Sequence, residues 1–517
     1  MAISRRNMIR MLAGSLPALA FTRTLAQIPG YPGFSRGPGP FQATRTSLSA
    51  YEIPEWFGKA KFGIWAHWGP QSAPEYGDWY ARNMYMQGSA QYEYHLKRYG
   101  HPSRFGFKDI IPTWKGEKFD PDYLVGLYKK AGARYFMSMG VHHDNFDMWN
   151  SRHHQWNAFR MGPHRDIVGE FRTAALRHGL KFGISDHLWI SYKWFSTSHG
   201  SDSLGALAGV PYDGANPAYK DLYQDVHTVY TQLSWDETGI PDAWKQAWFI
   251  RISDLIDHYS PDLLYCDGPI PFEQRGLEIV AKLYNQHTGP QEKKTQAVYT
   301  SKRQEDAAAG ICVLDVERGV VDGIWPRPFQ TDTCIGNWHY DVRAIYKTPK
   351  KIIDMLVDIV SRNGNLMLNF PLPSSGMLDE AELQILAAIT AWMQVNGEAL
   401  YDTVPWKIYG YGPGSAKPQE SSSFNENLQP ELGPSDFRFT QKGNKLYVFF
   451  MGWPNHPLAV KALGTNSQTD PGKILQVGLL GHAGQLDWSR NEEGLTINLP
   501  QQKPGDLGFA LRLIVQP

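Results

Sequence analysis

A regular alternation of short apolar runs and amphipathic segments, between Ser47 and about Tyr401, most constrains how this chain can fold. The apolar runs have the length and composition of buried strands, and the segments between them repeat apolar residues at helical spacing. This rhythm is typical of β-α units built around a parallel sheet. The candidate strands are 62–66, 135–141, 182–185, 263–265, 297–299, 311–314 and 366–370.

The number of these units favours a closed barrel. Nearly eight units fill about 350 residues, which is typical of an eight-fold barrel with long loops. No glycine-rich dinucleotide fingerprint follows the first strand, and this disfavours an open doubly wound sheet. The sequence therefore predicts an α/β fold with a (β/α)8-like barrel domain over 47–402. Helices are expected at 121–131, 166–178, 244–259, 272–287 and 379–396.

The pattern changes after Tyr401. Short alternating runs follow one another, separated by Gly, Pro and Asn and with no helical segment between them, which predicts an antiparallel β-sandwich over 403–517. The polar stretch 415–436 is expected to be a long surface loop within it. The candidate strands are 445–450, 474–478, 495–499 and 510–515.

The N-terminus has the order of a cleavable export signal. Arg5 and Arg6 precede a short apolar run that ends at Phe21, and small residues follow. The paired arginines are typical of the twin-arginine type, so residues 1–26 are interpreted as this signal and 27–46 as a linker. The apolar run is too short for a stable membrane anchor. We therefore expect a bacterial protein that is periplasmic or secreted.

Composition excludes several other classes of protein. The 51 basic and 51 acidic residues give a net charge of zero, which argues against a nucleic-acid partner. The three cysteines are too few and too scattered for a disulfide framework or a zinc site, and are expected to be small buried residues, with one adventitious pair left open. The 18 tryptophans and 26 tyrosines suit a protein that stacks on sugar rings or other planar ligands.

Polar residues follow the candidate strands at the positions where a barrel places its chemistry. His67 follows the first strand, His142 and His143 the second, and Asp267 follows strand 263–265, where a Gly-Pro turn comes directly after it. The pair Asp186 and His187 ends strand 182–185 in the same way, and Glu317 comes just after strand 311–314.

Two carboxylates from different strands, Asp267 and Glu317, with histidines and tryptophans between them are the residues a retaining glycosidase needs. Cleavage of a sugar acetal passes through an oxocarbenium-like state. It requires one ionised carboxylate below the anomeric carbon and one protonated acid beside the leaving oxygen. Histidines can donate to sugar hydroxyls, and tryptophans can stack on the apolar face of the ring.

The choice of the acid stays open at this point. Asp315 lies two residues before Glu317, so on an extended segment both side chains face the same side. Glu305 and Asp332 are lesser candidates for the acid, and both are expected in surface loops. Arg318 beside Glu317 would hold that carboxylate ionised unless its guanidinium points elsewhere.

Successive blocks of the chain resemble glycoside hydrolase family 29, the α-L-fucosidases. The blocks are 62–72, 77–85, 119–135 and 142–146, and the resemblance covers about 50 to 400 and, more loosely, the C-terminal region. It implies a barrel catalytic domain followed by a β-sandwich. It also implies retaining, exo-acting hydrolysis of terminal α-L-fucose from fucosylated oligosaccharides or glycoconjugates, with no metal and no cofactor.

The resemblance also implies roles for individual residues. Asp267 matches the nucleophile of the family, and Glu317 lies in a block that resembles the one bearing the general acid/base. The residues that match sugar-contacting positions are His67, Trp79, His142, His143, Tyr265 and Trp338. The chain departs from the family at Asn145, where many members have glycine.

Two other functions compete with this interpretation. One is a metal-dependent barrel hydrolase that uses His67, His142, His143 and Asp267 as ligands. Adjacent residues on an extended backbone point to opposite faces, so His142 and His143 are not expected to share a metal. The other is a sugar-binding protein without catalysis. The sequence leaves the fucosyl linkage and the oligomeric state open.

Overall fold

The computed structural model describes residues 39–289, 294–415 and 423–516. The predicted export signal, 1–26, and most of the predicted linker lie outside these residues. The short helix α1 (Arg45–Leu48) is the first regular element, and Thr44 caps it by accepting a hydrogen bond from the Ser47 amide.

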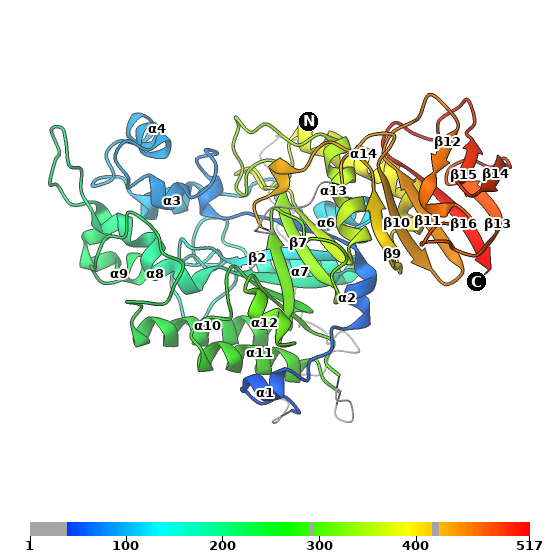
Figure 1. Cartoon of the computed structure of the whole chain (residues 1–517). Coiled ribbons are helices and arrows are strands. Elements are labelled where there is room, and N and C mark those ends of the chain that lie inside the picture. The colour runs from blue at the N-terminus through cyan, green and yellow to red at the C-terminus, as the bar shows by residue number, and fades with distance from the viewer. Residues whose placement is uncertain (1–38, 290–293, 416–422, 517) are drawn as a thin grey trace, which may run out of the picture. The chain divides into compact units, whose positions relative to one another are not determined.

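Eight parallel strands close into a barrel, with β1 paired to both β2 and β8. The predicted barrel is therefore confirmed (Figure 1). The strands are β1 (Phe62–Ala66), β2 (Tyr135–Val141), β3 (Lys181–Asp186), β4 (Leu263–Cys266), β5 (Val298–Ser301), β6 (Val313–Glu317), β7 (Phe329–Cys334) and β8 (Gly364–Asn369).

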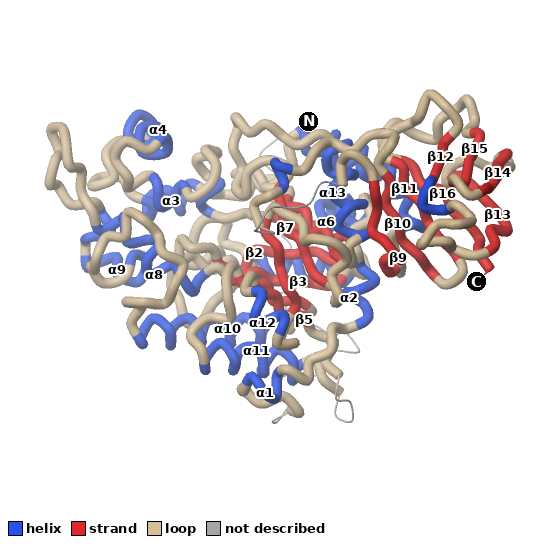
Figure 2. The backbone as a smooth tube through the Cα atoms, in the orientation of Figure 1, coloured by secondary structure: helices blue, strands red, loops and turns tan. Residues whose placement is uncertain are grey.

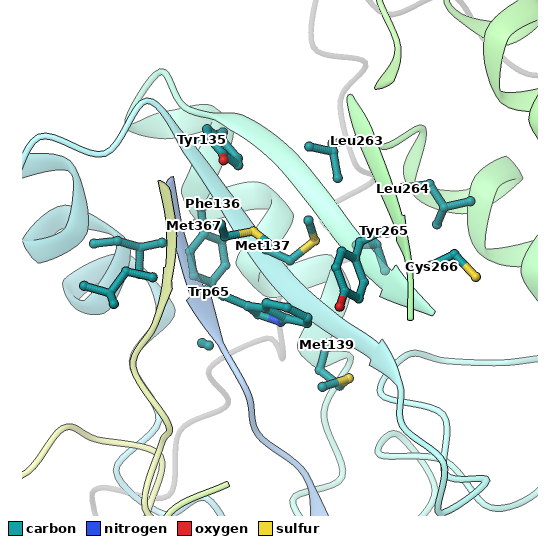
Figure 3. Close-up of a cluster of buried hydrophobic side chains, with 14 of the residues drawn as sticks. Trp65, Tyr135, Phe136, Met137, Met139, Leu263, Leu264, Tyr265, Cys266 and Met367 are labelled. Carbon is teal, nitrogen blue, oxygen red and sulfur yellow. The ribbon is translucent and has the colours of Figure 1, made fainter. Parts of the chain in front are cut away.

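The barrel strands are buried on both faces, which explains why most of them are continuous apolar runs rather than alternating ones. Every residue of β1, β2 and β4 is buried. Inside the barrel, the rings of Trp65 and Tyr265 pack with their centroids 4.7 Å apart (Figure 3). The interior is thus a packed core up to the rim, and not a pore.

Strand β7 was not predicted, because its middle is polar. Gln330, Thr331, Asp332 and Thr333 are all fully buried, so the expectation that Asp332 lies on the surface was wrong. Gln330 and Asp332 take part in a polar network inside the barrel. The Tyr135 hydroxyl donates to Gln330 Oε1 at 2.9 Å, and the Gln330 amide donates to Asp315 Oδ1 at 2.7 Å. A hydrophobic pattern cannot reveal a strand whose inward residues serve a polar network.

Helices surround the barrel (Figures 1 and 2). Asp120 and Asp166 cap α6 and α7 by accepting hydrogen bonds from the Tyr123 and Gly169 amides, as N-cap carboxylates do. The longer helices are α6 (Pro121–Lys130), α7 (Ile167–Arg177), α10 (Asp242–Tyr259), α11 (Gln274–Gln286), α13 (Pro349–Ser361) and α14 (Glu380–Asn396). The shorter ones are α2 (Glu55–Ala60), α3 (Tyr80–Asn83), α4 (Ala90–Arg98), α5 (Phe107–Ile110), α8 (Ser191–Trp194), α9 (Lys220–Tyr223) and α12 (Gln304–Ala308).

The C-terminal strands form two antiparallel sheets, with strand orders β13-β16-β11-β10-β9 and β12-β15-β14. The predicted antiparallel architecture is confirmed. Part of the predicted surface loop is not on the surface, since Asn425, Glu426 and Asp436 are buried. The strands are β9 (Val404–Tyr411), β10 (Phe437–Lys442), β11 (Lys445–Phe450), β12 (Leu458–Val460), β13 (Lys473–Leu479), β14 (Asp487–Asn491), β15 (Gly494–Asn498) and β16 (Phe509–Gln516).

Helix α13 packs against both the barrel strand β8 and the C-terminal strands β9 and β10. Asp358 on this helix pairs with Arg362 on the same helix, 2.9 Å away, and with Arg438 on β10. Arg438 is almost completely buried. The Arg362 guanidinium also stacks over the Tyr409 ring, 3.7 Å from its centroid. A buried ionic network therefore joins the barrel to the first C-terminal sheet.

Two further findings concern the chain as a whole. Cys266, Cys312 and Cys334 are buried and unpaired, so the pair left open by the sequence does not form. Among the described residues, no helix combines the length and apolar character needed to cross a membrane.

We expect Arg438→Ala to lower the free energy of unfolding by about 3–5 kcal/mol, because the substitution leaves the Asp358 carboxylate buried with one partner fewer. Urea unfolding followed by tryptophan fluorescence measures this. Lys442→Ala on the same strand is the control: its pair with Asp402 is about half exposed on both sides, so it should cost about 1 kcal/mol or less. Equal losses in the two variants would contradict the role of the network.

Candidate active site

A pocket of about 800 Å³ opens at the carboxyl ends of the barrel strands. This volume is within the range of small-molecule sites. Residues from seven of the barrel strands or the loops that follow them line it, together with Phe424 from the C-terminal region. The lining residues include Trp65, His67, Trp79, His142, His143, His187, Trp235, Tyr265, Asp267, Lys302, Glu317, Trp338 and His339.

The carboxylate of Asp267 lies at the centre of this pocket. It follows β4 directly, and its amide donates to the carbonyl of Asp186 on the neighbouring strand, at 3.0 Å. Its Oδ2 lies 3.2 Å from both His143 Nε2 and His187 Nδ1. Its Oδ1 lies 3.3 Å from the Tyr265 hydroxyl. The side chain is thus held in one orientation by its neighbours.

Asp267 is kept ionised by these contacts. Burial acts to raise its pKa, but the interactions with His143 and His187 and the positive charge of Lys302 hold that pKa well below its usual range. A carboxylate that remains negative while enclosed by histidines is suited to attack an electrophilic carbon.

Lys302 is the main residue of the site that the sequence interpretation missed. It follows β5, and its Nζ lies 2.8 Å from Glu317 Oε2, 3.4 Å from Asp315 Oδ2 and Asp332 Oδ2, and 3.6 Å from Asp267 Oδ1. Burial acts to lower the pKa of Lys302, but these four carboxylates raise it well above its usual range. The sequence does carry a signal for it, because Lys302 comes directly after a strand, as Asp267 and His67 do.

The cluster cannot hold four ionised carboxylates around one ammonium group at low cost. Burial raises the pKa of Asp315 to about 6. Burial together with the charge of Asp315 raises the pKa of Asp332 well above its usual range. Both residues lie inside the barrel, below the pocket, and the Tyr265 hydroxyl donates to Asp332 at 2.8 Å. They are suited to store protons rather than to contact a ligand.

Glu317 reaches the pocket, and Asp315 does not. Since Lys302 Nζ contacts both Asp267 Oδ1 and Glu317 Oε2, these oxygens can be no farther apart than the sum of 3.6 and 2.8 Å. This limit is below about 6.5 Å, which is the shortest separation between the two catalytic carboxyl groups in inverting glycosidases. The spacing therefore suits two carboxylates that act in turn on the same carbon.

The structure also shows where the Arg318 guanidinium points and where Glu305 lies. The Arg318 guanidinium is bound to Glu426, with Nε donating to Oε1 at 2.8 Å, so its strongest contact is away from Glu317. Glu305 lies exposed on α12 and does not line the pocket. Neither residue takes a direct part in the arrangement around Asp267.

His142 and His143 do not point to opposite faces, so that expectation was wrong. Strand β2 ends at Val141, and the backbone turns through both histidines, which brings their ring centroids within 4.5 Å. Asn145 completes the turn with φ of 60°. Asparagine adopts this left-handed conformation more readily than most residues, which explains why it can stand where many family members have glycine.

Four histidines of the pocket, His67, His142, His187 and His339, are neutral, because their pKa values are lowered. Burial lowers the pKa of His187 to about 4 and that of His339 to about 3, and it holds those of His67 and His142 well below the usual range. Within the described residues, His67 Nδ1, His187 Nε2 and His339 Nδ1 have no hydrogen-bond partner. Buried polar atoms without partners are costly, and three of them around one pocket mark it as a functional site rather than a structural core.

Aromatic rings form the walls around the histidines. Trp338 lies 5.0 Å from the His67 ring and 5.6 Å from Trp65. Asp78 fixes this segment, because its carboxylate accepts hydrogen bonds from the Trp338 and His339 amides at 3.1 and 2.6 Å. Trp235 and His339 were not predicted, and His187 was recognised at its strand end but was given no role in the site. Trp235 lies in a long loop with no strand pattern to point to it.

Three of the histidines could hold a metal ion. The ligand nitrogens of His142, His143 and His187 lie within 4.8 Å of one another. Two ring nitrogens are already engaged, however: the Gln71 amide contacts His142 Nδ1 at 2.8 Å, and His143 Nδ1 lies 2.6 Å from the His187 carbonyl oxygen. The three histidines do lie close enough to share a metal, contrary to the argument from the sequence. Adding a chelator therefore tests the alternative of a metal-dependent hydrolase.

A closed parallel barrel with paired carboxylates, neutral histidines and aromatic walls at its carboxyl rim defines the class of barrel glycoside hydrolases. The comparisons specify the family. The sequence profile described as Alpha-L-fucosidase matches residues 35–398, and that of the Alpha-L-fucosidase C-terminal domain matches 429–514. The chain belongs to the α-L-fucosidase family.

Individual relatives agree with this assignment. The tissue alpha-L-fucosidase of Rattus norvegicus is 26% identical over 472 residues, covering 89% of this chain and 88% of the relative. The plasma alpha-L-fucosidase of Homo sapiens is 27% identical over 501 residues, covering 92% of each chain. The crystal structure of Thermotoga maritima alpha-fucosidase has the same fold, with a TM-score of 0.71 and 23% identity over 92% of this chain and 100% of that one.

Proposed function

We propose that the chain is a retaining exo-α-L-fucosidase that removes terminal α-L-fucose from fucosylated glycans without a metal. The observation that carries this proposal is the position of Asp267, ionised and joined to Glu317 through Lys302. A crystal structure of the Thermotoga maritima alpha-fucosidase in complex with fucose, with a TM-score of 0.67 to this chain, supports the choice of sugar. The twin-arginine-like N-terminus supports export to the periplasm or beyond.

In the first step, the Asp267 carboxylate attacks the anomeric carbon of the fucose while Glu317, which enters the step in its protonated form, gives its proton to the departing glycosidic oxygen. The bond from carbon to this oxygen breaks, and an ester bond to Asp267 forms. In the second step, Glu317 takes a proton from water, and the water oxygen replaces Asp267 at the carbon. Two inversions return the original configuration.

The sugar-binding residues would act before and during these steps. His67, His142 and His187 offer neutral ring nitrogens to the fucose hydroxyls, and His143 together with His187 steadies Asp267. Trp79, Tyr265 and Trp338 provide apolar surface for the ring and its methyl group. The positive charge of Lys302 offsets the negative charge of Asp267 and, once Glu317 has given up its proton, that of Glu317 as well.

We expect Glu317→Ala to lower kcat about 10²–10⁴-fold on fucosylated oligosaccharides, because these leaving groups need a proton. The loss should be much smaller on an aryl α-L-fucoside with an acidic phenol. Azide should restore turnover of the aryl substrate and give a fucosyl azide as the product. Steady-state kinetics and product analysis by NMR measure these effects.

Glu305→Ala, on the exposed face of α12, is the matched control and should leave the kinetics unchanged. If Glu317→Ala keeps nearly full activity on oligosaccharides, the acid is elsewhere and Asp315 becomes the next candidate. A loss of activity on adding a chelator, reversed by zinc, would instead support the metal-dependent alternative at His142, His143 and His187.

The dependence on pH provides an independent test of the nucleophile. As pH falls, Asp267 should stay ionised because its pKa is well below the usual range, and His187 should stay neutral to about pH 4. We therefore expect kcat/KM for an aryl α-L-fucoside to show no acidic limb above about pH 5. An acidic limb near pH 6 that disappears in Asp315→Asn would show that Asp315, with its pKa of about 6, limits the reaction.

A further inference from the structure

A short segment of the C-terminal region, residues 423–429, lies against the loop that carries Glu317. We call it the C-terminal arm. The amide of Phe424 donates to the carbonyl oxygen of Glu317 at 2.7 Å, and the amide of Glu426 donates to that of Arg318 at 2.9 Å. These backbone bonds tie the arm to the end of β6, next to the pocket.

Side chains on the arm strengthen this attachment. The Asn425 amide group pairs with the backbone of Val320 in both directions: Oδ1 accepts at 3.1 Å and Nδ2 donates at 3.2 Å. Glu426 is buried, and its carboxylate meets Arg318 at 2.8 Å and Lys347 at 3.1 Å. The arm is therefore a fixed part of the pocket rim and not a passing contact.

Phe424 stands out on this fixed arm. It lines the pocket, yet 65% of its surface is exposed. Its backbone also adopts φ of 57°, a left-handed conformation that is unfavourable for a bulky residue. A well-anchored segment thus holds a large apolar ring in water, at the mouth of a pocket, on a strained backbone. Ligand pockets are lined largely by apolar and aromatic side chains, so a ring held at the pocket mouth is suited to contact a ligand.

The position of Phe424 indicates which part of a substrate it would meet. The buried histidines and Asp267 occupy the inner pocket, where the fucose has to lie for attack at its anomeric carbon. Glu317 marks the place of the glycosidic oxygen, and Phe424 is bonded directly to the Glu317 backbone. The sugar beyond the glycosidic oxygen is therefore the part that would lie near Phe424. Trp235 also lines the pocket and is 47% exposed, but its ring neighbours are Trp79, His143 and Trp189.

We propose that Phe424 forms a subsite for the leaving group, where its ring packs against the apolar face of the sugar to which the fucose is attached. The C-terminal region then contributes directly to substrate choice in a pocket that is otherwise built by the barrel. This inference rests on the proposed fucosidase function and adds to it a residue that determines specificity. The occupant is a pyranose ring, which has the flat apolar face that an aromatic side chain recognises.

The kinetics of the variant Phe424→Ala on three substrates distinguish a leaving-group subsite from an effect on Glu317 or on the whole pocket. α-L-Fucosyl fluoride has no leaving-group ring and needs no acid, so its kcat/KM should stay within about twofold of the wild type. 2-Chloro-4-nitrophenyl α-L-fucoside has a ring but little need of an acid, and a fucosylated disaccharide has both. For these two substrates we expect KM to rise about fivefold to tenfold, with kcat nearly unchanged. Phe424→Tyr should keep the wild-type values.

Leu428→Ala is the matched control, because Leu428 is 60% exposed on the same arm and does not line the pocket. It should leave all three substrates unaffected. If Phe424→Ala lowers only kcat, and only for the disaccharide, Phe424 merely positions Glu317 and the proposal is wrong. An equal loss on the fluoride would also overturn it, because the whole pocket would then be disturbed. A wild-type protein inactive on all three substrates would instead refute the fucosidase function itself.

Discussion

The parallel direction of all eight barrel strands is the constraint on which the rest of the molecule depends. Since each strand ends at the same rim, residues from distant parts of the sequence meet there: His67 after β1, Asp267 after β4, Lys302 after β5 and Glu317 at the end of β6. Asn369 at the end of β8 closes the ring, as its side chain accepts from the His67 amide and donates to the Trp338 carbonyl. The rim is one hydrogen-bonded structure, which keeps its functional groups in place before a ligand arrives.

Electrostatics divide the acidic residues of this rim into two groups. Asp267 is surrounded by histidines and lies near an ammonium group, so it remains negative, whereas Asp315 and Asp332 lie deeper and burial raises their pKa values. Lys302 contacts all of them and Glu317 as well. Residues of one chemical type thus acquire different states from their surroundings, which is how one site can hold both a nucleophile and stored protons.

The sequence contained most of the fold, because buried parallel strands and capped helices leave strong patterns. Its predictions failed where tertiary contacts override local pattern. Strand β7 is polar because its side chains serve a network inside the barrel, and Asp332 was placed on the surface for that reason. The rings of His142 and His143 lie close together because the backbone turns directly after β2. Trp235 and Phe424 could be recognised only once the chain was folded, since neither carries a local signal of function, whereas Lys302 shares the strand-end position of Asp267 and the histidines.

The central claim is that Asp267 forms a covalent bond to the sugar, and trapping that intermediate tests it most directly. A 2-deoxy-2-fluoro-L-fucosyl fluoride should inactivate the enzyme with time, because the fluorine at C2 slows both steps while the reactive fluoride leaving group keeps the first step fast enough for the ester to accumulate. Mass spectrometry of the digested protein should then find one fucosyl group per chain, on the peptide that contains Asp267. Labelling at Asp315, Glu317 or Asp332, or turnover of fucosides with no trapped adduct at any residue, would contradict the account.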